Sequence, residues 1–217
     1  MKILTFDTCL DKMYVTIADD EKILSSKIIE TTKENYHSAF LISTIKERLK
    51  ENSLKPKDVD IIATNIGPGS FTGIRACTTV ARVFAQACST KAVGVSSLEI
   101  LSKLNTTDKK TLVALDARKE MVYVAIYDRN NQILEPQTIL IEKLKEIISE
   151  DNYFIITDDK LQPIFSGISY QQSGANLGEF LARIVFEKIQ TDVDTDWKNL
   201  HPLYIQPPPV TMKKIVY

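Results

Sequence analysis

Hydrophobic residues near the N-terminus fall in short runs that are typical of β-strands. Residues 2–8, 13–18 and 23–29 are rich in β-branched and aromatic side chains, and short polar turns separate them. This pattern predicts a three-stranded antiparallel meander. The same arrangement returns at 111–134, which predicts a second meander in the C-terminal half.

The segments that follow each meander change to the period of a helix. A helix and then a strand are predicted after each one, at 34–51 and 59–65 in the first half and at 141–150 and 153–157 in the second. The first half continues with a helix over 70–89 and a strand over 91–95, and the second with a short segment over 159–165 and a helix over 173–190. We therefore expect the second half to be an eroded copy of the first.

A shift of 109 residues, the difference between Asp7 and Asp116 in the numbering, aligns the two meanders. It matches the acidic residue that ends each first strand, and it places Tyr14 on Tyr123. The apolar positions of the strands match as well. The alignment predicts a duplicated chain.

These elements predict an α/β protein with two lobes. We expect a first lobe over residues 1–106, a second and reduced lobe over 107–200, and a proline-rich C-terminal strap over 201–217. Four of the eight prolines lie in the strap, so it should run as an extended segment.

The composition is that of an ordinary globular protein, with 44% hydrophobic and 25% charged residues in 217. The 27 basic and 28 acidic side chains argue against a chain that grips nucleic acid by itself, because phosphate contacts need an excess of Lys and Arg. No apolar run resembles a signal sequence or a membrane span. With an odd set of three cysteines, these features predict a cytoplasmic protein with free thiols.

Glycine is concentrated in one loop. Three of the seven glycines lie within 67–73, where the sequence reads GPGSFTG between a predicted strand and a predicted helix. Such a loop can bind an anion at the helix N-terminus. This one lacks the lysine and hydroxyl of a Walker loop and the spacing of a dinucleotide fingerprint, so we expect it to shape the entry to the helix.

The two predicted helices of the first lobe carry more apolar side chains than one buried face needs. The helix over 70–89 has only two charged residues, Arg75 and Arg82, and they lie on one stripe. A helix that is apolar on most sides packs in its own core or against a partner, and both interpretations stay open here. The candidate partner-interface residues are Phe40, Leu41, Ile45, Phe71, Ile74, Arg75, Cys77, Val80, Ala81 and Phe84.

Several motifs together resemble the bacterial TsaB (YeaZ) family. They are the run GPGSFTGIR over 67–75, the opening ILTFDT over 3–8, His37-Ser38, LDAR over 115–118 and the strap motif PLYI over 202–205. The resemblance implies an actin-like, sugar-kinase and Hsp70-related fold of two duplicated lobes. It also implies a non-catalytic scaffolding subunit of the complex that forms N6-threonylcarbamoyladenosine next to the anticodon of ANN-decoding tRNAs.

The same resemblance implies the partners. They are the catalytic paralogue TsaD, bound through the helices over 34–51 and 70–89, the ATPase TsaE, a second copy of the chain when TsaD is absent, and tRNA through the complex. ATP and Mg²⁺ would be used by the complex, with no cofactor of the chain's own. Cys77 and Val83 stand where the family usually has glycine, and Gln206 where arginine is common, so the contact geometry should differ.

Asp7, Thr8 and Asp116 are the remaining candidates for chemistry. In actin-like folds the duplicated turns hold nucleotide phosphates through a metal, so a small ATPase or small-molecule kinase that uses Asp7 and Asp116 is the alternative function. Against it, an Asp that ends a strand often caps its own turn, and the second lobe lacks a glycine-rich turn. His37 is followed by Leu41 where the paralogue has a second metal-binding histidine, so we expect no metal site and no peptidase activity.

Overall fold

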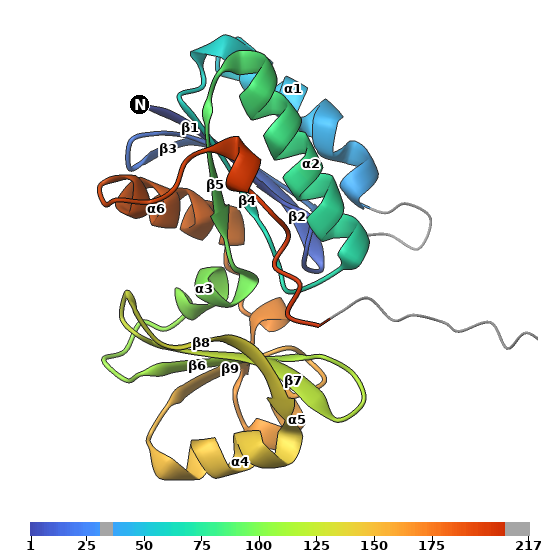
Figure 1. The fold of residues 1–217 in the computed structure, drawn as a ribbon, viewed down its shortest axis with the longest axis vertical. Helices are drawn as coiled ribbons and strands as arrows, with labels where there is room; N and C mark the ends of the chain where they lie inside the picture. Colours follow the sequence, from blue (N-terminus) through green and yellow to red (C-terminus); the bar gives the residue numbers. More distant parts are fainter. Residues whose placement is uncertain (31–36, 207–217) are drawn as a thin grey trace, which may run out of the picture.

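The computed structural model describes residues 1–30 and 37–206, which form two α/β lobes stacked one on the other (Figure 1). The first lobe contains a five-stranded sheet with the strand order β3-β2-β1-β4-β5. Its strands are β1 (Lys2–Asp7), β2 (Lys12–Asp19), β3 (Lys22–Glu30), β4 (Ile61–Asn65) and β5 (Lys91–Val95). The predicted meander is confirmed.

The second sheet repeats the topology of the first, with the order β10-β9-β6-β7-β8. Its strands are β6 (Thr111–Asp116), β7 (Met121–Asp128), β8 (Asn131–Leu140), β9 (Phe154–Thr157) and β10 (Ile168–Ser169). Strand β1 pairs antiparallel with β2 and parallel with β4, and β6 pairs in the same way with β7 and β9. The duplicated architecture predicted from the sequence is therefore confirmed.

The helices form three layers around the two sheets (Figure 1). Helices α1 (Leu41–Glu51) and α2 (Phe71–Cys88) cover the outer face of the first sheet, α3 (Ser97–Ser102) and α6 (Leu177–Ile189) lie between the sheets, and α4 (Ile141–Glu150) and α5 (Gln162–Phe165) cover the second sheet. Short 3-10 turns are η1 (His37–Phe40), η2 (Pro56–Asp58), η3 (Tyr170–Gln172) and η4 (Trp197–Asn199).

Two helix boundaries differ from the prediction. The helix predicted over 34–51 begins as a 3-10 turn and becomes α-helical only at Leu41, and residues 34–36 lie outside the described residues. Helix α6 begins at Leu177, because the side chain of Asn176 accepts a hydrogen bond from the Gly178 amide and caps the helix there.

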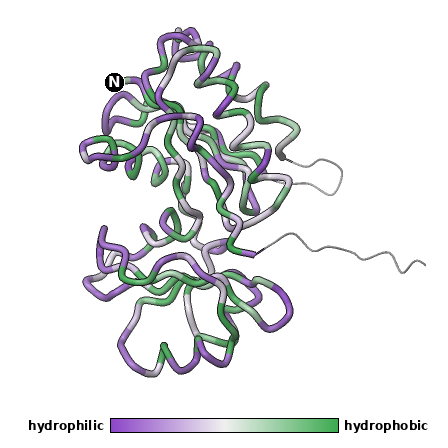
Figure 2. Tube along the Cα trace, viewed as in Figure 1, coloured by the Kyte–Doolittle hydropathy of each residue, from purple (hydrophilic) through white to green (hydrophobic). Residues whose placement is uncertain are grey.

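Three hydrophobic cores hold the layers together. One lies between the first sheet and α1 and α2, one between the second sheet and α4 and α5, and the largest lies between the two sheets around α3 and α6. The central core contains residues of both lobes, among them Ile3, Val113 and Leu181. In Figure 2 the hydrophobic stretches follow the strands and the inner sides of the helices, and the hydrophilic ones follow the turns.

Helix α6 lies within the range that we assigned to the second lobe, but it packs mainly on the first sheet. Gly178 permits this close approach, since a Cβ there would lie 2.6 Å from Thr16 Oγ1 and 2.8 Å from Tyr14 Cβ. The chain therefore returns to the first lobe after the second sheet is complete.

The predicted equivalence of Asp7 and Asp116 is wrong by one residue. Asp7 pairs across the strands with Tyr14, which lies in the core between the sheets, whereas Asp116 pairs with Val122, which lies in the outer core of the second lobe. Residues that pair directly in antiparallel strands share a face. Tyr14 pairs with Asp7, whereas the matching Tyr123 pairs with Leu115, so residues 8–13 separate the first pair and residues 116–122, one more, separate the second.

Within the part of the chain that the structure describes, we find no helix with the length and apolarity needed to cross a membrane.

Candidate functional site

The glycine loop packs directly on the turn that follows β1. Ser70 N donates to Cys9 O at 2.8 Å, and Thr8 Oγ1 donates to Gly73 O at 2.9 Å. A Cβ on Gly73 would overlap the carbonyl oxygen of Thr8, so only glycine fits at this crossing. The loop fastens the start of α2 to the end of β1.

Several amide groups of the loop are engaged within the chain. Gly67 N donates to Asn65 Oδ1 at 2.8 Å, and Gly73 N donates to Ser70 Oγ at 3.3 Å. Ile74 N bonds to Ser70 O at 2.8 Å. A phosphate site of this type needs such donors to point at the ligand. The bonds therefore support the architectural role that we expected for the loop.

The C-terminal strap crosses α2 and holds both of its arginines. Arg75 Nε donates to Tyr204 Oη at 2.9 Å, and its guanidinium carbon lies 5.9 Å from the centre of the Tyr204 ring. Arg82 Nη1 lies 3.2 Å from Nδ1 of His201 in the strap, and the Arg82 guanidinium lies 5.8 Å from the centre of the Trp197 ring just before the strap. The charged stripe of α2 thus faces the chain's own C-terminal segment, whose residues 207–217 lie outside the described residues.

Five of the predicted interface residues belong to the first lobe's own core instead. All five are buried and lie in the cluster between the sheet and the helices: Leu41, Ile45, Ile74, Cys77 and Ala81. Their apolar character reflects packing on the sheet. The surface of the free chain does not offer them to a partner.

The other five predicted residues remain at least partly accessible. Phe40 and Arg75 are exposed, and Phe71, Val80 and Phe84 are half-buried. Phe71 stacks on the strap, with its ring centre 5.8 Å from that of Tyr204. Among these residues, Phe40, Val80 and Phe84 border the outer surface of α1 and α2.

The sequence-based prediction missed Ile42 and Val83, whose side chains are 69% and 60% exposed. On α2 the exposed side chains around Val83 are uncharged: Thr72, Thr79, Gln86 and Ala87. We call Ile42, Val83 and these four residues the outer face. The sequence feature that could have identified Val83 is its position on a helix with few charged residues. Only the packing of the helix shows which of its apolar residues point outward.

Asp7 is part of a buried polar network that joins three elements. Its Oδ1 accepts from Cys9 N at 2.6 Å, and its Oδ2 accepts from Asn65 Nδ2 at 2.9 Å. Asn65 Oδ1 in turn accepts from Ser97 Oγ at 2.8 Å. The carboxylate of Asp7 thus connects β1 to β4 and, through Asn65, to α3. Sequence reasoning missed Asn65, a buried polar residue at a strand end.

Asp116 lies in the second lobe, where a lysine pairs with it. Its Oδ2 accepts from Lys160 Nζ at 2.7 Å, and its Oδ1 accepts from Arg118 N at 3.1 Å. Burial alone would raise the pKa of Asp116, but the hydrogen bonds from Lys160 and Arg118 lower it below the ordinary value. The bonds of Asp116 therefore go to its own lobe.

Tyr170 is buried near carboxylates of both lobes. Burial raises the pKa of its hydroxyl, and the negative charges of Asp11, Asp158 and Asp7 raise that pKa further. Tyr170 packs in the core between the two sheets. Thr8, the third predicted cleft residue, is also buried and bonds to α2. The side chain of His37 lies outside the described residues.

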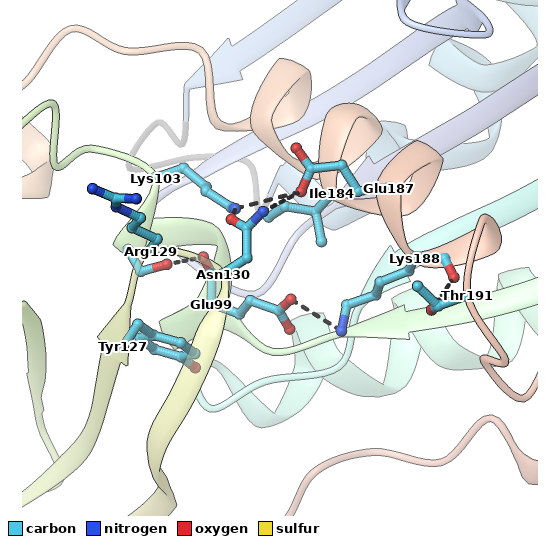
Figure 3. Close-up of a pocket in the computed structure, with 10 residues that line it drawn as sticks. Glu99, Lys103, Tyr127, Arg129, Asn130, Ile184, Glu187, Lys188 and Thr191 are labelled. Carbon is cyan, nitrogen blue, oxygen red and sulfur yellow. Dashed lines mark hydrogen bonds and ion pairs between the residues drawn. The ribbon is translucent and has the colours of Figure 1, made fainter.

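A cavity of about 340 Å³ opens on another side of the molecule, between α3, the β7–β8 turn and α6 (Figure 3). Lys188 Nζ lies 3.0 Å from Glu99 Oε1, and Lys103 Nζ lies 3.6 Å from Glu187 Oε2. Arg129, the remaining charged side chain of the lining, pairs with an aspartate at its edge. None of the predicted cleft residues lines this cavity.

The two sheets of matching topology and the shared central core define an α/β protein of two duplicated lobes. YeaZ from Pseudomonas aeruginosa has the same fold, with a TM-score of 0.75 at 20% identity over 94% of this chain and 99% of that one. A family model described as TsaD, tRNA N6-adenosine threonylcarbamoyltransferase, matches residues 22–172. The chain belongs to this family.

Two relatives carry the name tRNA threonylcarbamoyladenosine biosynthesis protein TsaB. The one from Buchnera aphidicola subsp. Schizaphis graminum is 32% identical over 135 residues, which cover 61% of this chain and 63% of that relative. The one from Bacillus subtilis is 28% identical over 156 residues, covering 69% and 67%. The match to the Buchnera relative thus spans less than two thirds of that relative's length. The resemblance to TsaB (YeaZ) seen in the motifs is confirmed.

Proposed function

We propose that this chain is a non-catalytic scaffolding subunit of the complex that forms N6-threonylcarbamoyladenosine next to the anticodon of tRNA. In this role it supports a catalytic TsaD-type paralogue. The names of its TsaB relatives support the pathway, and the match to the TsaD family model supports the relation of this chain to the catalytic paralogue.

The outer face of α1 and α2 is the observation that carries the proposal. Ile42 and Val83 expose apolar side chains there, and the exposed residues of α2 around Val83 are uncharged. Helices that face water normally carry charged residues on the exposed side. Large apolar side chains that a helix exposes on an uncharged face are suited to contact with another protein. The TsaD-type paralogue is the partner that we place on this face.

The remaining partners follow from the same assignment. A second copy of the chain would use the outer face when the paralogue is absent, the ATPase TsaE would join the complex, and tRNA would be bound by the complex as a whole. ATP and Mg²⁺ would serve the complex, and the assembly would work in the cytoplasm.

The candidate catalytic carboxylates support a silent subunit. Asp7 is 1% exposed and bonded within a buried network, and Asp116 is paired with Lys160. The alternative, a small ATPase or small-molecule kinase that uses Asp7 and Asp116, therefore has less support.

Reconstituted threonylcarbamoyl transfer tests the proposal. The TsaD-type enzyme of the same organism is assayed on tRNA with TsaE and ATP, with and without this chain. We expect modification to depend on the chain and the two proteins to co-elute. Equal modification without the chain would overturn the scaffolding role. Calorimetry of the lone chain with Mg-ATP tests the alternative, which requires binding that Asp7→Ala removes.

A further inference from the structure

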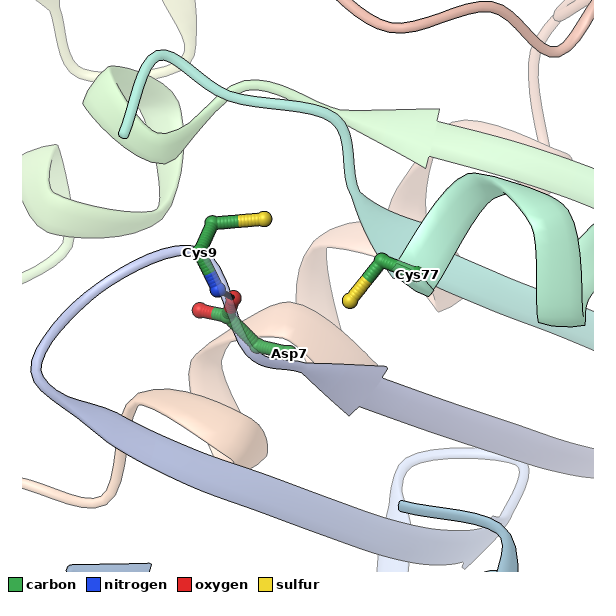
Figure 4. Close-up of side chains that lie close together, drawn as sticks. All are labelled: Asp7, Cys9 and Cys77. Carbon is green, nitrogen blue, oxygen red and sulfur yellow. Dashed lines mark hydrogen bonds between the residues drawn. The ribbon is translucent and has the colours of Figure 1, made fainter. Parts of the chain in front are cut away.

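Three buried side chains from different elements meet beside the glycine loop. Asp7 ends β1, Cys9 follows in the turn, and Cys77 lies on α2. One carboxylate oxygen and the two sulfur atoms all lie within 4.8 Å of one another. Figure 4 shows the two thiols extending from opposite sides into the space beside the Asp7 carboxylate.

These donors are of the kind that a zinc-class cation prefers. Two sulfurs and one carboxylate oxygen form a borderline-soft set, which suits Zn²⁺ better than the all-oxygen sites of Mg²⁺ or Ca²⁺. Ligand atoms about 2.0–2.3 Å from a tetrahedral Zn²⁺ lie roughly 3.5–4 Å apart. The side chains would close by about 1 Å at most to reach that geometry.

The surrounding groups already hold two of the three donors. Asn65 Nδ2 donates to Asp7 Oδ2 at 2.9 Å. Thr8 N donates to Cys77 Sγ at 3.2 Å. The Cys9 thiol donates to Asn65 O at 3.3 Å, a bond that is lost when the thiol proton leaves. Partners of this kind fix ligand orientation around protein-bound metals.

We propose that Asp7, Cys9 and Cys77 form a binding site for one thiophilic divalent cation of the Zn²⁺ class. Binding releases the two thiol protons to solvent and forms two metal–sulfur bonds and one metal–oxygen bond. The charge of the cation offsets two of the three negative charges of the ligands.

The site goes beyond the scaffolding role and does not depend on it. A bound cation would fasten α2 to the turn after β1, directly beneath the outer face. The expected consequence is a more rigid start of α2.

Cobalt and zinc titration of the reduced, metal-free full chain tests the site. Co²⁺ should bind with one equivalent per chain and give the near-ultraviolet absorption of cobalt–thiolate bonds, and Zn²⁺ should displace it. Cys9→Ser and Cys77→Ser should each bind Zn²⁺ at least about tenfold more weakly, measured in competition with a chromophoric chelator.

Cys88→Ser is the matched control, because Cys88 lies on the same helix and outside the cluster. It should keep one equivalent and the cobalt–thiolate band. If the wild-type chain shows no such band, or if Cys9→Ser binds as tightly as Cys88→Ser, the site does not exist. The wild-type spectrum decides the matter even if a cysteine variant fails to fold. The free thiols of the protein as isolated should also be counted. If only one of the three cysteines reacts with a thiol reagent, Cys9 and Cys77 form a disulfide, and the proposal is overturned.

Discussion

Asn65 Nδ2 donates a 2.9 Å hydrogen bond to Asp7 Oδ2, and both side chains are shielded from solvent. The bond joins the ends of the neighbouring strands β1 and β4. Through its Oδ1, Asn65 also receives hydrogen bonds from Gly67 N and Ser97 Oγ. One amide therefore holds the end of the first strand, the glycine loop and the start of α3 in place.

Replacing Asn65 by alanine should destabilise the fold strongly. The amide of Gly67 and the hydroxyl of Ser97 would lose a buried acceptor, and each loss of this kind costs about 1–3 kcal/mol. We expect the free energy of unfolding in urea to fall by about 3 kcal/mol. The exposed Asn152 provides the control, and Asn152→Ala should change the value by less than about 0.5 kcal/mol. Similar effects of the two variants would show that the network contributes little.

The strap should add measurable stability through Tyr204. Tyr204→Phe removes the bond from Arg75 and keeps the ring, so we expect a loss of about 0.5 kcal/mol in the free energy of unfolding. Tyr204→Ala also removes the contacts with Phe71 and the Arg75 guanidinium, and it should cost about 1 kcal/mol or more. If both variants unfold at the wild-type urea concentration, the strap is not held by this residue.

The ion pair between Asp116 and Lys160 should give a pH-dependent contribution to stability. The pKa of Asp116 is lowered from 3.8 in the folded protein, so its contribution is complete above pH 3.8 and is lost as the pH falls through the folded value. The pKa of Lys160 is raised from 10.5, so its contribution is complete below pH 10.5 and is lost as the pH rises through the folded value. The pair therefore stabilises the fold between these limits.

Lys160→Met tests this window. The variant should unfold at a lower urea concentration than the wild type at pH 7, and the difference should shrink toward pH 3 and in high salt, since the lysine is exposed. Lys143→Met, at an exposed position on α4, is the control and should show no such pH dependence. A difference that is constant from pH 3 to pH 7 would point to lost packing instead of the ion pair.

The alternation of apolar and polar residues was enough to predict most strands, both meanders and the duplication. It could not predict α3, because Ser97–Ser102 is too short for a helical period to show. It also placed Asp7 on Asp116, because acidic residues end both strands and a sequence shift does not reveal that the β1–β2 and β6–β7 connections differ in length.

The candidate site was predictable only in part, because the sequence pattern does not show which apolar residues the packing exposes. Leu41 and Ile42 are adjacent apolar residues on one helix, yet the first is buried and the second is 69% exposed. Only the packing of α1 on the sheet fixes which of them faces the core. In the same way, Cys9 and Cys77 are far apart in the chain, and they meet because glycines allow the loop to approach the turn after β1.

Val83 gives the most direct test of the scaffolding role, because its side chain is 60% exposed on the outer face. Val83→Glu should leave the folded chain intact, since surface substitutions usually change stability by less than about 0.5 kcal/mol. Burying an unpaired carboxylate in the interface would cost several kcal/mol. Circular dichroism confirms the fold before the binding measurement.

The decisive measurement is the mass, by light scattering, of the mixture with the TsaD-type paralogue. Ile133→Glu is the matched control, because Ile133 is 57% exposed on β8 of the other lobe. We predict a heterodimer for the wild type and Ile133→Glu, and separate proteins or an affinity at least about a hundredfold weaker for Val83→Glu. A heterodimer of unchanged affinity with Val83→Glu would contradict the assignment of the outer face as the partner surface.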